Sequence, residues 1–281
     1  MKLLKFAAGW FIPHSAVRTI KLIKGKRELS LRIERLKSAS RLEEGKKAVD
    51  FDYDGAIDYL VSLGCEKSQV LYGSMPKESL SYVASLLSRL PQGNPINGLH
   101  IGNFVGVSLA YFTKLVVALH KDSIMVSIDP NIPHRGIINP LGKVVALLAY
   151  FGLEGNSVIL TGYSLEKNVS NDGSLYGTHY DPLKNYHKEV SCTRQLEALK
   201  KLGMTGKFDF LTIDGNHDGS YLSREITGCI HLLKPEGLIV MDDVTSTWAE
   251  VKSIFEKLTE QGFVQVGYDG RVGILKIPNQ K

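Results

Sequence analysis

The carboxyl-terminal end of the chain limits what the rest can fold into. Two β-prone runs, residues 263–268 and 271–277, are separated only by Asp269-Gly270, a residue pair typical of two-residue hairpin turns. A connection between parallel strands needs a dozen or more residues, so these two strands must be antiparallel. The sequence therefore predicts a sheet that ends in an antiparallel hairpin, an ending that an all-parallel dinucleotide-binding domain lacks.

Upstream of the hairpin, short strand-like runs alternate with segments of helical spacing. The strand-like runs are residues 99–102, 124–129, 157–161, 208–214 and 238–242, and the helical segments are 105–119, 141–151, 221–233 and 248–258. Another helix is predicted to begin at Ser74-Met75-Pro76, with a capping serine and an early proline. Such alternation is typical of a parallel sheet covered by helices on both faces. The predicted fold class is α/β, with a seven-stranded sheet of five parallel strands plus the terminal antiparallel hairpin.

Length and composition exclude several other classes of protein. The 281 residues suffice for one well-buried domain, and 43% apolar with 22% charged residues describe a globular chain rather than a disordered or fibrous one. No window approaches the roughly 18 consecutive apolar residues of a membrane-spanning helix. Cys65, Cys192 and Cys229 are too few and too far apart for a disulfide framework, and no cleavable signal is predicted. We therefore expect reduced thiols and a cytoplasmic location.

The basic charge is concentrated near the amino terminus. Residues 1–47 hold 13 Lys and Arg against 4 Asp and Glu, a net charge of +9, whereas the whole chain carries +5, so the remainder is net −4. Apolar residues at positions 29, 33, 36 and 42 predict a partly helical arm over 1–50, ahead of a main domain over 51–281. The arm is interpreted as a solvated helix face. Peripheral contact with an anionic membrane, or packing on another subunit of a homo-oligomer, is the alternative.

Some loop segments carry polar side chains. An excess of about forty residues over 165–207, after the third predicted strand, predicts a lid-like insertion. His134 and Arg135 lie in an earlier loop, and the insertion contains His179, Tyr180 and His187. These five residues are interpreted as exposed loop residues, and a role in shaping an acceptor pocket is the alternative.

The first predicted strand runs into a glycine-containing turn, from His100 through Gly102 and Asn103 to Gly106. Glycine at a strand-to-helix turn lets the backbone approach a ligand, and the helix amino terminus offers free N–H groups. A tight turn without a ligand explains the two glycines equally well. Asp129 ends the second strand, where a carboxylate accepts hydrogen bonds from ribose hydroxyls, although Asp129-Pro130 also suits a simple turn. Together these residues favour a ribonucleotide-type cofactor at the carboxyl edge of the sheet.

Carboxylates end the fourth and fifth predicted strands. Asp214 and the pair Asp242-Asp243 follow apolar runs directly, which places all three at the same edge of adjacent strands. Neighbouring carboxylates repel unless a cation or buried protons compensate them. The sequence therefore predicts Mg²⁺, or another divalent cation, held by Asp214, Asp242 and Asp243. The alternative is helix capping, although the run Thr245-Ser246-Thr247 is already available for that.

These motifs resemble those of a known family. Residues 213–217 (IDGNH), 232–240 (LLKPEGLIV) and 242–243 (DD) are similar to class I S-adenosylmethionine-dependent methyltransferases, in particular the macrocin O-methyltransferase-like and cephalosporin hydroxylase-like branch of the Methyltransferase 24 type. The resemblance covers roughly residues 70–277 and implies a Rossmann-like methyltransferase sheet. It also implies a cofactor site made of His100, Gly102, Asn103, Gly106, Asp129, Gly162, Tyr163 and Ser164, with Asp129 on the ribose and residues 162–164 beside the adenine. Asp214, Asp242 and Asp243 fall where metal-dependent members bind their cation.

Two positions depart from the family pattern. His100 stands where the family usually has an acidic residue that contacts the amino group of the cofactor. Asn216 stands where some sugar O-methyltransferases have an aspartate proposed as the base, which leaves His217 as the nearest candidate.

The function predicted on this basis is metal-assisted methyl transfer from S-adenosyl-L-methionine to a small polyhydroxylated acceptor such as a sugar or glycan intermediate. Asp214 and His217 are the predicted catalytic residues, with His217 taking the proton of the acceptor; a plain hydrogen bond in a loop is the other interpretation of His217. Two further functions stay open: an inactive methyltransferase-like scaffold and a nicotinamide-dependent oxidoreductase. No nucleic-acid partner is expected.

Overall fold

The computed structural model describes residues 49–278, apart from residue 92 and residues 167–192. The predicted amino-terminal arm and most of the predicted lid-like insertion, with His179, Tyr180 and His187, lie outside the described residues. The division into an arm and a main domain therefore stays a prediction. Of the cysteines, Cys65 and Cys229 are buried and free. Among the described helices, none is both long enough and apolar enough to cross a membrane.

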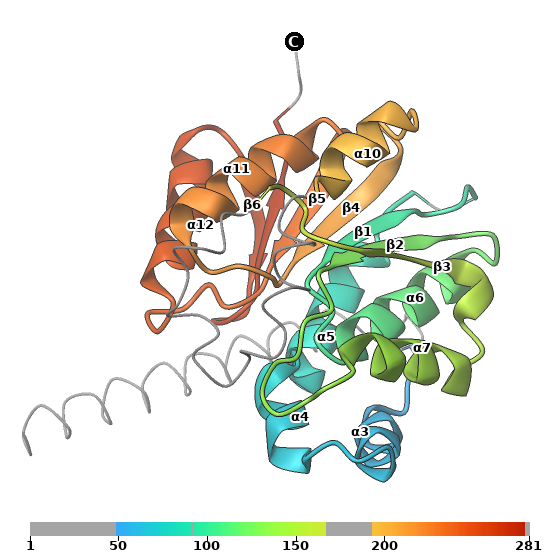
Figure 1. Cartoon of the computed structure of the whole chain (residues 1–281). Coiled ribbons are helices and arrows are strands. Elements are labelled where there is room, and N and C mark those ends of the chain that lie inside the picture. The colour runs from blue at the N-terminus through green and yellow to red at the C-terminus, as the bar shows by residue number, and fades with distance from the viewer. Residues whose placement is uncertain (1–48, 92, 167–192, 279–281) are drawn as a thin grey trace, which may run out of the picture. The chain divides into compact units, whose positions relative to one another are not determined.

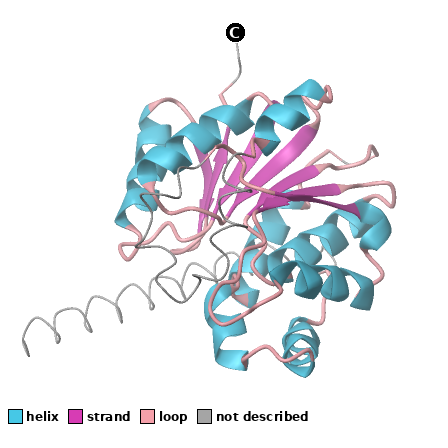
Figure 2. Cartoon of the chain, in the orientation of Figure 1, coloured by secondary structure: helices cyan, strands magenta, loops and turns pink. Residues whose placement is uncertain are grey.

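The sheet has seven strands in the order β3-β2-β1-β4-β5-β7-β6. The strands are β1 (Gly98–Ile101), β2 (Met125–Asp129), β3 (Ser157–Thr161), β4 (Phe208–Ile213), β5 (Leu233–Met241), β6 (Val264–Tyr268) and β7 (Gly273–Lys276). The first five are parallel, and β7 runs antiparallel between β5 and β6. Figure 2 shows helices on both faces of this sheet. The predicted fold class is thus confirmed.

Helices cover the sheet from both sides (Figure 1). The described helices are α3 (Tyr53–Ser62), α4 (Lys67–Gly73), α5 (Lys77–Leu87), α6 (Val107–Leu119), α7 (Pro140–Tyr150), the short 3₁₀ helix η1 (Glu154–Asn156), α10 (Gln195–Lys201), α11 (Gly219–Ile230) and α12 (Ala249–Glu260). Two of them, α3 and α4, were not identified individually from the sequence. The predicted serine cap of α5 is wrong, because Pro76 occupies the N-cap position and no side chain caps the helix.

Alternation of side chains along each strand divides the core in two. On β4, Phe210 packs in a cluster that contains Phe112 of α6, whereas Leu211 and Ile213 pack in a second cluster with Leu222 of α11. A strand buried on both faces carries apolar residues at successive positions, which is why the strand-like runs read as continuous apolar segments. The polar residues that follow these runs therefore lie at the carboxyl edge of the sheet, beyond the packed layers.

The terminal hairpin turn is built around the side chain of Asp269, which is almost fully buried. Its carboxylate accepts hydrogen bonds from the backbone N–H groups of Arg271 and Val272, each at 2.7 Å, and from the Ser79 hydroxyl at 2.7 Å. Residues 271 and 272 are therefore engaged by the turn, and β7 begins at Gly273 rather than at the predicted residue 271. The turn also fixes where the Arg271 side chain starts, next to the end of β5.

Candidate active site

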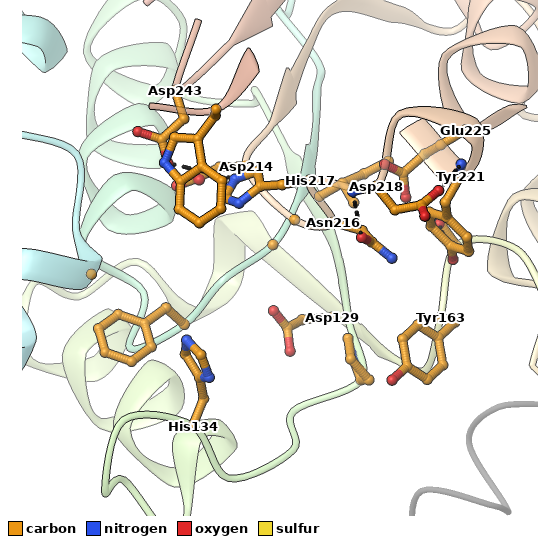
Figure 3. A pocket seen from close by; sticks show the side chains of 18 of the residues that line it. Asp129, His134, Tyr163, Asp214, Asn216, His217, Asp218, Tyr221, Glu225 and Asp243 are labelled. Carbon is orange, nitrogen blue, oxygen red and sulfur yellow. Dashed lines mark hydrogen bonds and ion pairs between the residues drawn. The ribbon is translucent and has the colours of Figure 1, made fainter. Parts of the chain in front are cut away.

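A pocket of about 690 Å³ lies at the carboxyl edge of the sheet, where β1, β2, β4 and β5 end. Its wall includes Gly102, Asp129, Asp214, His217 and Asp243. Figure 3 shows Asp129 and Tyr163 on one side of the open space and the group around His217 on the other. The carboxyl edge of an open α/β sheet is where such folds place ligands, because helix amino termini and loop ends converge there.

The two glycines of the first turn are required by the backbone. Gly102 has φ +92°, and a Cβ atom there would lie 2.0 Å from the carbonyl oxygen of Asp214. Gly106, the N-cap of α6, has φ +90°, and its Cβ would lie 3.2 Å from the Cα of Val144. The overlap at Gly102 excludes any residue with a side chain, whereas at Gly106 the positive φ and the tight contact strongly favour glycine. The close approach at Gly102 also brings the ends of β1 and β4 together, so the turn shapes the pocket whether or not a ligand is bound.

Asp129 organises the loops at one side of the pocket. Its carboxylate accepts hydrogen bonds from the backbone N–H of Asn103 at 2.6 Å and of Asn131 at 2.5 Å. Burial raises the pKa of Asp129, and these backbone donors act in the opposite direction. The turn interpretation is therefore satisfied, since Asp129 bonds to the residue two positions on. The same carboxylate lines the pocket, where its remaining lone pairs are available to a ligand.

His100 does not line the pocket, which argues against its predicted contact with the cofactor. Its side chain is fully buried on the face of β1 that packs on α6, and its Nε2 lies 3.1 Å from the hydroxyl oxygen of Ser108. Burial lowers the pKa of His100 to about 3, so the ring is neutral. The alternation of side chains along β1 turns position 100 toward the sheet face, whereas Ile101 and Gly102 reach the pocket.

Asn103 and Gly106 belong to the turn but not to the pocket wall. The Asn103 side chain is buried, and its amide donates to the Ser127 hydroxyl at 3.2 Å. Its contribution near the pocket is its backbone N–H, which binds Asp129. Neither residue offers a side chain to a ligand in this arrangement.

The segment Gly162-Tyr163-Ser164 forms another part of the wall. The Tyr163 N–H donates to the Thr193 hydroxyl at 2.6 Å, and the Ser164 hydroxyl lies 3.0 Å from the Tyr221 hydroxyl and also bonds to Glu225. These contacts tie the loop after β3 to α11 and to the segment just before α10. The Gly162 N–H donates to the Asp129 carbonyl at 2.9 Å, and all three residues line the same pocket as Asp129; their place beside the adenine stays a prediction.

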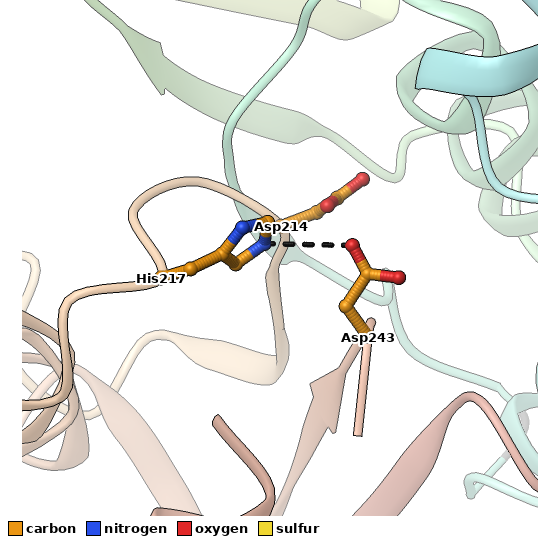
Figure 4. A group of neighbouring side chains, drawn as sticks. All are labelled: Asp214, His217 and Asp243. Atoms are coloured by element: carbon orange, nitrogen blue, oxygen red, sulfur yellow. Dashed lines mark ion pairs between the residues drawn. The ribbon is translucent and has the colours of Figure 1, made fainter. Parts of the chain in front are cut away.

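Asp214, His217 and Asp243 form a compact group on the opposite side of the pocket (Figure 4). One ligand atom from each lies within 4.8 Å of the others, and His217 Nε2 lies 3.5 Å from a carboxylate oxygen of Asp243. The Asp214 carboxylate accepts no hydrogen bond from any described residue. The sequence predicts His217 as a base candidate, and the structure adds its close approach to the Asp243 carboxylate, which becomes an ion pair when the ring is protonated.

Asp242 is not part of this group, and the predicted set of three free carboxylates is not formed. The Arg271 guanidinium donates from Nε and from Nη2 to the two carboxylate oxygens of Asp242, both at 2.7 Å. The same Nη2 lies 3.3 Å from Asp243. The Asp242 side chain is fully buried, and Arg271 is 20% exposed. A fork of this geometry uses both oxygens of the carboxylate, so a cation of the protein itself compensates part of the acidic charge.

The sequence pattern does not predict the role of Arg271, because around this residue it indicates only a hairpin. Its partner is 29 positions away, and the contact depends on β7 pairing with β5 rather than on any local pattern. The position of Arg271 can be predicted only from the order and direction of the strands. An antiparallel strand beside β5 begins at the edge where β5 ends, so an arginine just before it lies next to Asp242.

The electrostatics of the group favour proton exchange. Burial, followed by repulsion from Asp242 and Asp243, raises the pKa of Asp214 well above its usual range. Burial and the Asp242 charge raise the pKa of Asp243 to about 6. Burial lowers the pKa of His217 despite the opposing effect of Asp242. Near neutral pH the His217 ring is therefore unprotonated and able to accept a proton.

The helix after β5 supplies an aromatic wall. Trp248 is the N-cap of α12, without any capping side chain, so the predicted capping by residues 245–247 is wrong. The Trp248 and His217 rings have centroids 4.1 Å apart and are tilted by 40°. This contact holds the imidazole against the pocket wall. Tyr72, Phe104, His134 and Arg135 also line the pocket.

Comparisons with known proteins agree with this architecture. The sequence matches a family model described as a methyltransferase domain over residues 99–244, more than half of the chain. The fold is similar to the SAH-bound methyltransferase PaMTH1 of Podospora anserina, with a TM-score of 0.53 and 12% identity, covering 87% of this chain and 94% of that chain. It is also similar to the O-methyltransferase of Bacillus cereus in complex with SAH, with a TM-score of 0.51 and 11% identity, covering 85% and 94%. At these identities the structural likeness establishes the fold alone. No curated protein matches the sequence.

Proposed function

The chain belongs to the family of methyltransferase domains, and from that premise we propose that it transfers a methyl group from S-adenosyl-L-methionine to a hydroxyl oxygen of a small polyhydroxylated acceptor. The observation that carries the proposal is a single pocket that joins Gly102 and Asp129, at one side, to His217 and Asp243 at the other. A donor and an acceptor must meet in one cavity for an in-line displacement.

The donor side is supported by the chemistry of Asp129 and the neighbouring backbone. A buried carboxylate that is already held by backbone N–H groups is rigid and is suited to accept two ribose hydroxyls. Gly102 also lines the pocket, and as a glycine it presents only main-chain atoms to the sulfonium end of the donor. Two of the similar structures contain SAH, which agrees with a donor of this kind in the same fold.

In the proposed reaction, the acceptor oxygen attacks the methyl carbon, the bond between that carbon and the sulfonium sulfur breaks, and its electron pair stays on sulfur. The products are the methylated acceptor, S-adenosylhomocysteine and one proton. His217 takes that proton, and the Asp243 carboxylate at 3.5 Å stabilises the imidazolium that results. Trp248 keeps the ring in place. Asp214, which has no hydrogen bond from a described side chain, accepts one from a second hydroxyl of the acceptor and so selects a polyhydroxylated molecule.

Divalent-metal assistance is not included in this mechanism, because the predicted ligands do not fit. Asp242 gives both of its oxygens to Arg271, and the guanidinium also lies 3.3 Å from Asp243. Asp214, His217 and Asp243 remain as grouped donor atoms, but a permanent positive charge stands beside them and repels a second cation. We therefore assign the role of counter-charge to Arg271.

Calorimetry and a labelled-methyl assay test the proposal. Titration with S-adenosylhomocysteine should give a saturable heat that Asp129→Asn weakens, whereas His217→Asn should bind as the unmodified protein does. With labelled donor and a panel of polyols, sugars and catechols, methyl transfer should fall about a hundredfold or more in His217→Asn, the usual share of general-base catalysis. His120→Asn, outside the pocket wall, serves as the matched control.

The two alternative functions give different results in the same experiments. An inactive scaffold binds no S-adenosylhomocysteine or transfers no methyl group to any acceptor. A nicotinamide-dependent oxidoreductase binds NAD(H) in preference, which absorbance of the nicotinamide detects. Either outcome would overturn methyl transfer as the function.

A further inference from the structure

We infer that Arg135 is an anion-binding residue of the acceptor pocket, and that the acceptor carries a carboxylate or a phosphate group in addition to its hydroxyls. The inference rests on the proposed function and names the class of substrate. It is drawn from the contacts of the Arg135 side chain, the backbone conformation of this residue and its place in the pocket wall.

Arg135 forms no ion pair with an acidic side chain among the described residues, although its charge helps to lower the pKa of Asp243 across the pocket. Its guanidinium lies over the Tyr72 ring, 4.4 Å from the centroid, at the end of α4. Tyr72 is itself 70% exposed, so this stacking buries little surface. A cation on an aromatic ring keeps its outward N–H groups free for a ligand, and the planar fork of arginine matches the oxygens of carboxylate and phosphate groups.

The backbone at Arg135 is an unfavourable one for arginine. His134 and Ile137 exchange backbone hydrogen bonds at 3.2 and 2.9 Å, and the two residues between them have φ +51° at Arg135 and +77° at Gly136. Two successive left-handed residues define a type I′ turn, where glycine, asparagine and aspartate are the usual residues. A side chain with a Cβ at that position is disfavoured. Because this turn does not need an arginine in order to fold, we attribute the arginine to a binding role of its side chain.

The turn faces the catalytic group across the pocket. Arg135 and its neighbour His134 line the same cavity as His217 and Asp243, and Figure 3 shows His134 on the far side of the open space from His217. The other described arginine of the wall, Arg271, is neutralised by Asp242. Arg135 is thus the lining cation, among the described residues, that keeps its charge for a ligand. An acceptor whose hydroxyl reaches His217 can place an anionic group on Arg135, with Phe104 and Trp248 along its length.

Direct binding to the full-length protein saturated with S-adenosylhomocysteine tests the inference. Three probes of matched size are titrated by calorimetry at constant ionic strength: benzoate, phenyl phosphate and the neutral benzyl alcohol. We expect at least one of the anions to bind about tenfold or more tightly than benzyl alcohol, since a charge-assisted hydrogen bond contributes that much. The preferred anion tells a carboxylated acceptor from a phosphorylated one.

Variants separate a binding role from a structural one. Arg135→Gln should lose the preference for the anion, about tenfold, with no change in its affinity for S-adenosylhomocysteine or benzyl alcohol, and Arg135→Lys should restore part of it. Arg89→Gln removes the same charge from an exposed position outside the pocket wall and should change nothing. The inference is overturned if neither anion is preferred, or if Arg135→Gln binds the anions as well as the unmodified protein. Failure of the proposed function is distinguishable, because in that case the unmodified protein does not bind S-adenosylhomocysteine.

Discussion

Replacing Arg271 by methionine should show how far the buried acidic group lowers the free energy of unfolding when its counter-charge is removed. The guanidinium makes two hydrogen bonds of 2.7 Å to a carboxylate that is fully buried, and lies 3.3 Å from a second carboxylate. Methionine keeps most of the volume but leaves Asp242 charged and without its partner. Removing one member of a buried ion pair lowers stability by about 3–5 kcal/mol. We therefore expect Arg271→Met to lower the free energy of unfolding by that amount in urea titrations at pH 7.

The same substitution should create the metal site that the sequence predicts. Without the guanidinium, Asp214, Asp242 and Asp243 present oxygen ligands that Mn²⁺ or Mg²⁺ accepts. A cation that binds only the folded state raises stability by RT ln(1 + [L]/Kd), about 2.7 kcal/mol at a concentration of one hundred times Kd. Titrating Mn²⁺ into Arg271→Met, followed by electron paramagnetic resonance and by the unfolding midpoint, should show saturable binding and a partial recovery of stability.

Two controls and one adverse result complete this test. Arg271→Lys keeps the charge without the fork and should remain metal-free. Arg271→Met combined with Asp242→Asn removes the orphaned carboxylate, so it should recover stability and lose the gain in Mn²⁺ affinity. The reasoning is refuted if the unmodified protein binds Mn²⁺ as tightly as Arg271→Met, because Arg271 then does not take the place of a cation.

Three further predictions follow from the geometry of the pocket. The pH dependence of kcat/KM should show an acid limb with a midpoint below 6.5, since burial lowers the pKa of His217 and its unprotonated ring is the active form. The midpoint describes the titration of the His217–Asp243 pair, and a midpoint above 7.5 in the labelled-methyl assay contradicts His217 as the base. Asp214→Asn should lower activity and raise the free energy of unfolding at pH 8, because a carboxyl whose pKa is raised in the folded state opposes folding when it is ionised. This penalty shrinks as the pH falls toward 4, where the carboxyl is protonated in the folded state, and urea titrations in which the unmodified protein is the more stable at pH 8 contradict the prediction. Gly102→Ala should lower stability by about 2 kcal/mol or more and abolish binding of S-adenosylhomocysteine, because the new Cβ meets backbone at 2.0 Å and the residue has φ +92°. Gly155→Ala is the control: its Cβ has no heavy atom within 4 Å, so thermal unfolding and calorimetry should show both properties unchanged.

Much of the fold is local in origin, and the sequence predicted it for that reason. Strand-like runs, helical spacing and the Asp269-Gly270 turn are properties of short segments. The right family followed from motifs at the ends of two strands, and the family match over residues 99–244 confirms it. The pocket edge was predictable as well, because parallel strands end on the same side and their terminal residues must meet there.

Where the prediction failed, the deciding contact spans the tertiary structure. His100 turns away from the pocket because the pleat of β1 assigns it to the face that packs on α6. Trp248, rather than a threonine or serine, is the N-cap of α12, and its ring packs against the His217 ring. Neither feature can be predicted from the spacing of the residues concerned.

The sequence by itself determined that acidic side chains gather at one edge of a parallel sheet, since the order of strands and carboxylates along the chain is sufficient for that. Only the tertiary structure decided which charge they meet. Antiparallel insertion of β7 between β5 and β6 places the Arg271 guanidinium on Asp242, 29 positions away in the chain. Ion pairs form between groups that the fold brings within a few ångström, and separation along the chain carries no information about that distance.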